Sequence, residues 1–579
     1  MAKLTVDQKT VKDLFVNKKS DFLIPDYQRP YAWSEEECQT LWDDLFDFAF
    51  PELDYEKFSS DSEYYLGPIV TYKNDDNKLE IIDGQQRLTT IMLLLRAFYT
   101  KFGNMQDEKS RSTRDVIAQC IWKTDEFGKP LTDQLKIDSE VATDDDKEGF
   151  LNILKSGIAD KNDRSKYATN YRFFQDKIAE FLDKFPSWFS FLPVRILNNC
   201  ILLPIDADNQ DTALRIFSTL NDRGLPLSDA DIFKAQFYNF FKTQGKKDAF
   251  IAKWRELESL CSELFENTSA NAMDELFTRY MYFERAKQNI TSSTTEALRK
   301  FYERDKYAVL KSEETFENLR DLATFWDAVY RQDKNRFSEE VLKELFVLNY
   351  APNRMWTYIV SVYYLQNRDQ DGMLEEEKFV PFLKKIIGFI WAYAIINPGM
   401  NALRAPIYSE MRKIVLGEPI EFSNYKFDKE NVRSLLELYR FYNGRPITKS
   451  MLVWWMYQNK DQELIPLDTK FDIEHIFARK RYENDKSSLK DPNNLESLGN
   501  KAVLEKRINI RAAEYRFEDK RKYYQGFMTA RNKQKDKTVN TELVTLADLP
   551  DFTEQSIVER KKQILNSFIS YLENNNLLK

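Results

Sequence analysis

Glycine and proline are scarce in this chain, and this scarcity limits the fold more strongly than any other sequence feature. The 579 residues include only 15 Gly and 18 Pro, while 31% of the residues are charged. Because both residues disfavour helix interiors, their scarcity together with abundant charge favours long helices. Hydrophobic residues make up 42% of the chain, which is enough to form cores and excludes a wholly disordered protein. At about 150 residues per domain, the length predicts three or four domains.

The N-terminal segment 1–110 has a mixed α/β pattern. β-branched and aromatic residues over 64–72 and 79–82 predict a hairpin around a polar turn at 74–77. Farther along, the patterns predict a buried helix over 88–99, helices and loops over 104–170, a short buried strand over 201–205 and a helix capped by Ser228 and Asp231. For the rest of the chain they predict helices over about 245–465, a short strand over 471–476 and a helix over 554–578. The expected fold class is therefore mostly α, with an α/β domain at the N-terminus.

His475 is the only histidine, and this narrows the chemistry of the chain. A single histidine excludes every metal site built on two histidines, including the H-E-x-x-H motif. The phosphate-binding motif G-x-x-x-x-G-K-[ST] is also absent from the sequence. The four cysteines are isolated, which argues against a disulfide scaffold or a cysteine-based zinc site and fits a reducing compartment.

The sequence predicts a soluble cytoplasmic protein that does not bind or span a membrane. Residues 1–21 are polar and charged, so no signal peptide is expected. The most apolar stretch, 386–396, is too short to span a bilayer. Lys384 and Lys385 flank it.

Charge is distributed unevenly along the chain. The formal net charge of −8 and a pI near 5.4 exclude a surface that binds nucleic acid over its whole area. Residues 501–537 nevertheless contain 12 Lys+Arg against 5 Asp+Glu. Such a basic segment suits DNA binding through one domain, although a solvated helix face explains most charge runs taken alone.

A first candidate site is the motif Asp83-Gly84-Gln85-Gln86-Arg87, which follows the predicted strand and precedes the predicted helix. A helix N-terminus offers free N–H groups and the positive end of the helix dipole to a phosphate. Gly84 lets the backbone approach closely, Arg87 can bind a phosphate in a bidentate fork, and Asp83 can hold a metal or orient a water. An ordinary strand–turn–helix with a surface arginine is the alternative.

Two further segments carry polar residues in settings that suit a binding site. Gln28 and Arg29 lie in an aromatic loop with a proline at each side, and Asn221 and Arg223 lie in a turn before a capped helix. Neither segment is specific alone.

A second candidate site surrounds His475, which follows Glu474 at the end of the predicted strand 471–476. Phosphodiester cleavage with one metal needs a general base, and a neutral imidazole with a pKa near about 6.5 suits that role. The metal needs hard oxygen ligands, which Glu474 and an asparagine carbonyl can supply. Asn500 and Asn509 are nine positions apart, consistent with a loop and a helix facing one site. A lone core histidine among polar loop residues is the alternative.

Taken together, the three N-terminal motifs resemble those of GmrSD-type modification-dependent restriction enzymes. The resemblance covers about residues 10–240 and implies a domain whose fold is like that of ParB and sulfiredoxin. It also implies nucleotide binding and hydrolysis. The residues implicated are Gln28, Arg29, Asp83, Gly84, Gln85, Gln86, Arg87, Asn221 and Arg223.

The segment from about 440 to 540 resembles the C-terminal domain of the same family, a small ββα-metal (HNH-type, or His-Me finger) nuclease. The family pattern matches Glu474-His475-Ile476, Leu498-Gly499-Asn500, Asn509, Lys520, and Tyr523 or Tyr524; Ala478 stands where the family often has proline. The resemblance implies that His475 is the base and that Glu474 and Asn509 are the metal ligands, with Asp472 as a competitor. Asn500 would orient the histidine loop, and Lys520 would belong to the catalytic set.

The resemblance implies three regions: a nucleotide-binding and DNA-sensing domain over 1–240, a helical coupling region over 241–440 and the nuclease over 441–579. The expected function is modification-dependent cleavage of double-stranded phage DNA with Mg or Mn, regulated by an NTP, with a homodimer as one mode of assembly. A nucleotide-switched DNA-binding regulator with a degenerate nuclease site and an enzyme that nicks any DNA are the alternatives. The basic residues expected beside the scissile phosphate are Lys506, Arg507, Arg511, Lys520, Arg521 and Lys522.

Overall fold

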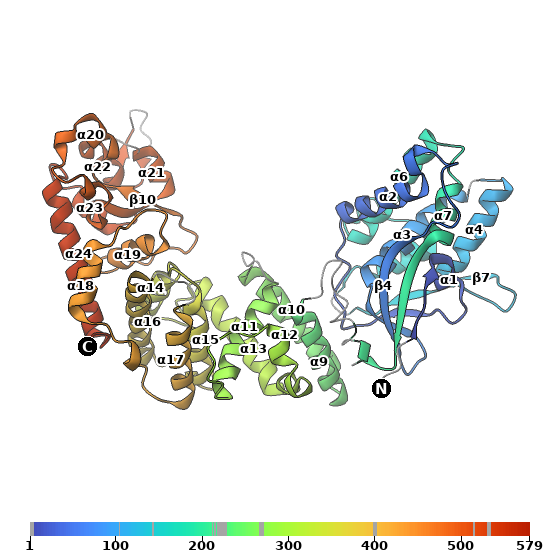
Figure 1. Cartoon of the computed structure of the whole chain (residues 1–579), viewed down its shortest axis with the longest axis horizontal. Coiled ribbons are helices and arrows are strands. Elements are labelled where there is room, and N and C mark those ends of the chain that lie inside the picture. The colour runs from blue at the N-terminus through green and yellow to red at the C-terminus, as the bar shows by residue number, and fades with distance from the viewer. Residues whose placement is uncertain are drawn as a thin grey trace. The chain divides into compact units, whose positions relative to one another are not determined.

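The computed structural model divides into two compact units, Met1–Arg255 and Glu256–Lys579 (Figure 1). Each unit is described by itself. The structure describes residues 5–103, 105–141, 144–210, 212–213, 216, 228–265, 271–397, 402–512, 516–529 and 534–579. Asn221 and Arg223 therefore lie outside the described residues.

A seven-stranded mixed sheet forms the β-structure at the core of the first unit. Its strands follow the order β1-β9-β4-β5-β3-β8, and β2 also pairs with β9. The long strand β4 pairs in parallel with β9 and antiparallel with β5, which confirms the predicted hairpin. The strands are β1 (Thr5–Val6), β2 (Lys9–Thr10), β3 (Phe22–Ile24), β4 (Tyr64–Lys73), β5 (Leu79–Asp83), β8 (Ile137–Ser139) and β9 (Cys200–Ala207).

Helix α3 (Gln85–Phe102) is the most deeply buried helix of this unit. Its apolar run over 91–95 is buried, and a helix that is hydrophobic all round belongs in a core. It packs against α4 and α6. The described helices of the unit are α1 (Val11–Val16), α2 (Glu35–Ala49), α3, α4 (Glu108–Ile121), α5 (Lys147–Ser156), α6 (Lys166–Lys184), α7 (Phe191–Asn199) and α9 (Asp229–Thr243), with α10 (Lys247–Leu264) running across the unit boundary.

Residues 104–170 contain strands that the sequence pattern did not predict. Besides β8, the strands β6 (Trp122–Thr124) and β7 (Pro130–Leu135) pair as a separate antiparallel ribbon. The residues of β7 are exposed or half-buried, so no apolar alternation marks it as a strand. By contrast, the predicted cap of α9 is confirmed, because Ser228 and Asp231 form a reciprocal capping box.

The second unit is helical apart from short strand pairs. In Figure 1 the helices α11 to α17 lie next to one another, and α11 packs against both α15 and α17. The unit's described helices before its strands are α11 (Ala272–Lys287), α12 (Leu298–Tyr302), α13 (Glu313–Tyr330), α14 (Glu339–Leu348), α15 (Met355–Asn367), α16 (Glu376–Ile396), α17 (Arg404–Leu416), α18 (Lys429–Leu438) and α19 (Pro446–Met456). The expectation of helices over 245–465 is confirmed.

Helix α16 is the one described helix that is long and apolar enough to cross a membrane by length and composition. Most of its apolar window is buried inside the structure, and Phe389, Ile390 and Trp391 have no exposed surface. It also packs against α14, α18 and the C-terminal helix α24 (Glu554–Asn574). These contacts are those of a core helix.

The last part of the chain is built on a strand pair followed by a short helix. Strands β10 (Phe471–His475) and β11 (Lys501–Glu505) are antiparallel, and α21 (Lys506–Ala512) follows β11 and packs on both strands. This gives a ββα order of elements. The other elements are α20 (Arg479–Asn484), the 3-10 turns η6 (Pro492–Glu496) and η7 (Leu498–Asn500), α22 (Phe517–Gln525), the pair β12 (Phe527–Met528) and β13 (Gln534–Lys535), α23 (Thr541–Leu546) and α24 (Glu554–Asn574).

Candidate functional site

The turn between β5 and α3 depends on Gly84. Its φ of 91° lies in the left-handed region that side chains rarely adopt. A Cβ here would also lie 3.2 Å from Ile69 and 3.3 Å from the carbonyl of Pro68. The helix therefore starts directly after the strand, at Gln85, rather than at Leu88 as the apolar pattern predicts.

The glutamines of the two N-terminal motifs join the aromatic loop to this turn. The amide of Gln28 donates to the carbonyls of Ile81 and Ile82, at 3.3 and 3.2 Å. The amide of Gln85 donates to the carbonyl of Arg29 at 3.3 Å. The structure thus brings Gln28 and Arg29 beside the Asp83–Arg87 motif, as one shared site requires.

Gln86 makes two bonds to the same loop. Its amide donates to the carbonyl of Pro30 at 3.2 Å, and its oxygen accepts from the backbone N–H of Ala32 at 2.6 Å. These bonds give Gln86 a positioning task in the loop. The Gln85 side chain is buried to a similar extent, but its Oε1 has no hydrogen-bond partner among the described residues.

Asp83 and Arg87 carry the charge of this site. Burial raises the pKa of Asp83, although the N–H of Gly84 and the charges of Arg87 and Arg29 oppose the shift. Burial lowers the pKa of Arg87, which Asp83 opposes. The Nη1 of Arg87 donates to the carbonyl of Pro68 at 2.8 Å. Its Nη2 and Nε make no hydrogen bond within the described part of the chain, so they can meet a ligand oxygen.

The second site lies on the strand pair. His475 ends β10 opposite Lys501, and Glu474 lies opposite Ala502. Neighbouring residues of a strand point to opposite faces, so the side chains of Glu474 and His475 lie on opposite faces of the strand pair and contact different groups.

His475 is 7% exposed and faces a cluster of charged groups. Its Nε2 lies 3.4 Å from Oε1 of Glu496 and 3.4 Å from Nη2 of Arg479. Burial lowers the pKa of His475 to about 4; Glu496 opposes the shift, and Arg479 and Lys501 add to it. The imidazole is therefore neutral near pH 7, which is the state a general base needs.

Glu496 is the centre of that cluster, and the sequence did not single it out. Its Oε1 accepts from Arg479 at 2.7 Å and its Oε2 from Lys501 at 2.6 Å. Burial acts to raise the pKa of Glu496, but Lys501, His475 and Arg479 outweigh it and lower the pKa. Glu496 is distant from His475 along the chain and lies in a run of polar residues, so no sequence signal sets it apart.

Asn500 holds the backbone that follows His475. Its Oδ1 accepts from the N–H of Phe477 at 2.7 Å, and its Nδ2 donates to the carbonyls of Phe477 and Leu495 at 3.1 and 2.9 Å. The backbone carbonyl of Asn500 also accepts from the N–H of Ile476 at 2.9 Å. This geometry suits the positioning role that the resemblance implies for Asn500.

Glu474 forms a buried cluster with α22. It is 3% exposed, and its Oε1 accepts from Nζ of Lys520 at 2.8 Å and from the hydroxyl of Tyr524 at 2.5 Å. Lys520 also donates to the carbonyl of His475 at 2.6 Å. Between the two tyrosines that the family pattern allowed, the structure brings Tyr524 to Glu474.

One part of the basic-segment prediction is wrong. Lys520 is 1% exposed and pairs with Glu474, so it cannot reach a DNA phosphate from the surface. Burial of an ammonium without a partner is costly, which explains why it takes a carboxylate inside the domain. Lys506, Arg507, Arg511 and Lys522 are exposed, and Arg521 is half-buried.

The remaining predicted ligands lie on the same ββα elements. Asn509 is half-buried on α21, and Asp472 is half-buried on β10. Burial lowers the pKa of Lys449, and the charge of Asp472 partly opposes this shift. The described part of the chain has no group of three or more His, Cys, Asp and Glu placed to hold a metal. The donors that the family resemblance implies are a carboxylate from Glu474 and an amide oxygen from Asn509. These hard oxygens suit Mg or Mn, with water completing the coordination.

Arg560 of α24 anchors the Leu498-Gly499-Asn500 turn. Its Nη1 donates to the carbonyls of Leu498, Gly499 and Lys501 at 3.2, 3.1 and 2.7 Å. Its other nitrogens form a bidentate pair with Glu542, at 2.7 Å each. Arg560 is one cation in a charged helix, so the sequence pattern gave no sign of this role.

Comparison with known families matches both ends of the chain. The model of the GmrSD restriction endonuclease N-terminal domain matches residues 11–238, and that of the GmrSD restriction endonuclease C-terminal domain matches residues 426–567. No curated protein matches the chain. The matched regions contain the Asp83–Arg87 turn and the His475 strand pair, respectively.

Proposed function

The chain belongs to the GmrSD restriction endonuclease family, and from this membership we propose that it cleaves modified double-stranded phage DNA under the control of an NTP. Restriction endonuclease activity implies DNA as the partner. The buried His475 at the end of β10, with its Nε2 3.4 Å from the carboxylate of Glu496, is the observation that carries the proposed mechanism. We place this activity in the cytoplasm.

In this mechanism His475 takes the proton of the water that attacks the phosphodiester. Glu496 stabilises the imidazolium that results, because its carboxylate lies 3.4 Å from Nε2. Asn500 fixes the loop after His475 through Phe477. A general base of this kind contributes about 10²–10⁴ in rate.

Glu474 and Asn509 are the residues proposed to hold Mg or Mn, with Asp472 as the competing ligand. The metal would stabilise the negative charge at the phosphate and the leaving oxygen. Lys520 and Tyr524 fix the Glu474 carboxylate at its Oε1. Lys520 also holds the His475 carbonyl, so it joins the two strand-end residues as a positioning residue.

The NTP is proposed to bind at the Asp83–Arg87 turn. The start of α3 supplies free N–H groups, and Arg87 keeps Nη2 and Nε for a phosphate. Gln85 adds a buried oxygen without a partner among the described residues. Asp83→Ala and Arg87→Ala should each reduce NTP turnover, while Asp76→Ala on the exposed hairpin turn should not; wild-type turnover in both site variants would place the NTP elsewhere.

His475→Ala tests the nuclease directly. Cleavage of a panel of differently modified phage DNAs, with Mg or Mn and each NTP in turn, should fall by at least about 10²-fold, with an unchanged melting temperature. Glu483→Ala on the exposed face of α20 is the control. Full cleavage by His475→Ala would contradict the assignment. Equal cleavage of unmodified DNA would support the alternative of an enzyme that nicks or cuts any DNA.

One observation favours a second function. The Lys520 ammonium on the Glu474 carboxylate neutralises the charge that a metal would use, as expected for a nucleotide-switched DNA-binding regulator with a degenerate nuclease site. Metal-dependent cleavage by the wild-type protein separates the two, because the regulator would bind DNA and leave it intact.

A further inference from the structure

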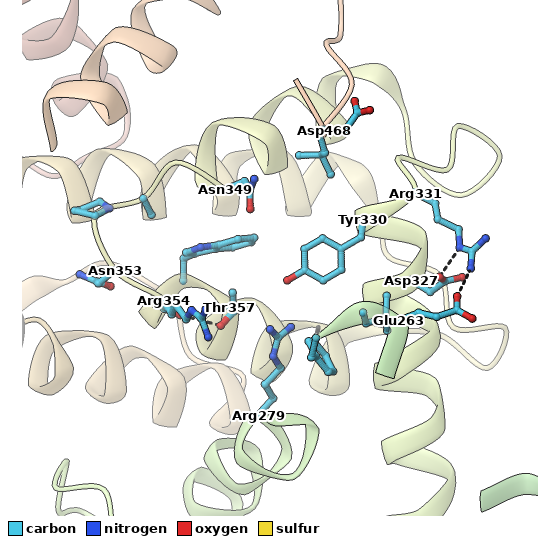
Figure 2. A pocket seen from close by; sticks show the side chains of 16 residues that line it. Glu263, Arg279, Asp327, Tyr330, Arg331, Asn349, Asn353, Arg354, Thr357 and Asp468 are labelled. Atoms are coloured by element: carbon cyan, nitrogen blue, oxygen red, sulfur yellow. Dashed lines mark hydrogen bonds and ion pairs between the residues drawn. The ribbon is translucent and has the colours of Figure 1, made fainter. Parts of the chain in front are cut away.

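A large polar cavity lies among helices of the second unit, and apart from residues 467–468 its lining falls outside both segments that the family models match. Its volume is about 920 Å³, at the upper end of the range typical of ligand sites. The walls come from the end of α10, from α11 and α13, from the α14–α15 loop with the start of α15, and from residues 467–468 (Figure 2). None of these residues belongs to the two sites described above.

Arg279 of α11 reaches into this cavity from one wall. Its side chain is 3% exposed; its Nε donates to Glu275 at 2.9 Å, and its guanidinium lies over the rings of Phe265 and Trp326. Nη1 is buried and has no hydrogen-bond partner in the described chain. A buried cationic N–H group without a partner is costly. Figure 2 shows the guanidinium directed toward the middle of the cavity, where the Tyr330 ring also lies.

The N-terminus of α15 supplies a second positive feature. This helix has 13 residues, and its N-cap residue, Arg354, makes no side-chain capping bond. Asn353 accepts from the N–H of Met355 at 2.9 Å, and the N–H of Thr357 donates to the carbonyl of Arg354 at 3.0 Å. Within the described chain this leaves the N–H of Trp356 in the first turn for solvent or a ligand. The Arg354 side chain is exposed and makes no ion pair within the described chain. The helix dipole and this cation together favour an anion.

The acids of the cavity are mostly engaged at its rim. Asp327 and Glu263 both bind Arg331, at 2.5 and 3.3 Å, and Figure 2 shows this group together at one side. Asp468 is exposed. The inner wall is therefore left to Arg279, the start of α15 and neutral polar groups such as Asn349.

We propose that this cavity binds an organic phosphate of nucleotide size. The phosphate would meet the guanidinium of Arg279 and the start of α15 beside Arg354, and the polar body would lie against Tyr330 and Asn349. The volume far exceeds what a bare phosphate fills. This site is separate from the proposed NTP site, which lies in the other unit. A free nucleotide and a nucleotide of bound single-stranded DNA offer the same chemistry.

Calorimetric titration of the full chain carrying Arg87→Ala tests the proposal, because that variant disables the proposed NTP site. Three probes are titrated: ATP, inorganic phosphate and a short single-stranded oligonucleotide. We expect one bound ATP or oligonucleotide per chain, at least tenfold tighter than phosphate. Binding of ATP identifies a free nucleotide as the ligand, and binding of the oligonucleotide alone identifies a DNA strand.

Two substitutions localise the binding. Arg354→Ala, at an exposed position, should weaken it about tenfold, and Arg279→Gln should weaken it at least as much. Arg404→Ala, at the start of α17, is the matched control for a cation at a helix N-terminus and should change nothing. Should Arg279→Gln not fold, Arg354→Ala still decides. Absence of binding to all three probes overturns the proposal, as does phosphate binding as tight as ATP or binding that Arg354→Ala leaves unchanged.

Discussion

Gly499→Ala should destabilise the second unit strongly, although Gly499 has an ordinary backbone conformation. The reason is the closeness of α24. A Cβ at this position would lie 2.1 Å from the carbonyl oxygen of Ile557 and 2.8 Å from the backbone nitrogen of Lys561. Ordinary contact begins near 3.4 Å, so the helix would have to retreat until that separation is restored.

The obstacle is helix backbone, which cannot rotate away as a side chain can. Overpacking costs about 1–3 kcal/mol and occasionally more. A retreat of α24 would also strain the bonds from Arg560 to the carbonyls of the same turn, and hydrogen bonds to charged groups contribute about 1.5–3 kcal/mol each. We therefore expect a loss of about 3–5 kcal/mol. At about 2.1 cal/mol/K per residue, this corresponds to roughly 4–8 °C in the melting temperature of a unit of this size.

The measurement is thermal unfolding, together with hydrogen exchange of the β10 and β11 amides, which should speed up. Gly444→Ala is the matched control, because a Cβ at Gly444 meets nothing within 4 Å. That variant should melt within about 1 °C of the wild type. A Gly499→Ala protein that melts with the control would refute the argument, since it would show that α24 moves away at little cost.

Three further predictions concern buried polar groups. Burial raises the pKa of Glu344 from 4.5 to about 7, so the folded state loses stability as the pH rises between these two values. Glu344→Gln should therefore be more stable than wild type above pH 7 by about 1–3 kcal/mol. Melting temperatures of the variant and the wild type that depend on pH in the same way would contradict this. Lys520→Met leaves Glu474 buried without its cation and should cost about 3–5 kcal/mol; Glu474→Gln added to it should recover most of the loss in urea unfolding. Asn500→Ala removes three bonds, including both to Phe477, and should cost about 2–4 kcal/mol and most DNA cleavage; a variant that cleaves at the wild-type rate would remove Asn500 from the site.

Local patterns predicted the fold where the signal was local. The hairpin of β4 and β5, the capped start of α9 and the short strand β10 follow from residue types and spacing within short stretches of chain. The sequence pattern did not predict the ribbon of β6 and β7, because an exposed strand pair needs no apolar face. It also did not predict the early start of α3, because a left-handed glycine cap rather than apolar spacing determines where that helix begins.

The candidate sites were predictable in their motif residues and not in the groups that surround them. His475 and Asn500 could be found from their neighbours in sequence. Glu496 and Arg560 could not, since their roles arise from contacts with residues distant along the chain. The burial of Lys520 was equally hidden, because a lysine that pairs with a distant carboxylate has the same local sequence as one that faces solvent.

The anchoring of the Leu498-Gly499-Asn500 turn by Arg560 also has a consequence for synthesis. Arg560 follows Gly499 by 61 residues, and translation at about 5–20 residues per second separates their appearance by roughly 3–12 s. During that interval the strand pair and the histidine have already been made, but the helix that holds their turn is still missing. A nascent chain on the ribosome thus carries an unfinished centre, so the cell would meet the assembled nuclease only after α24 has emerged.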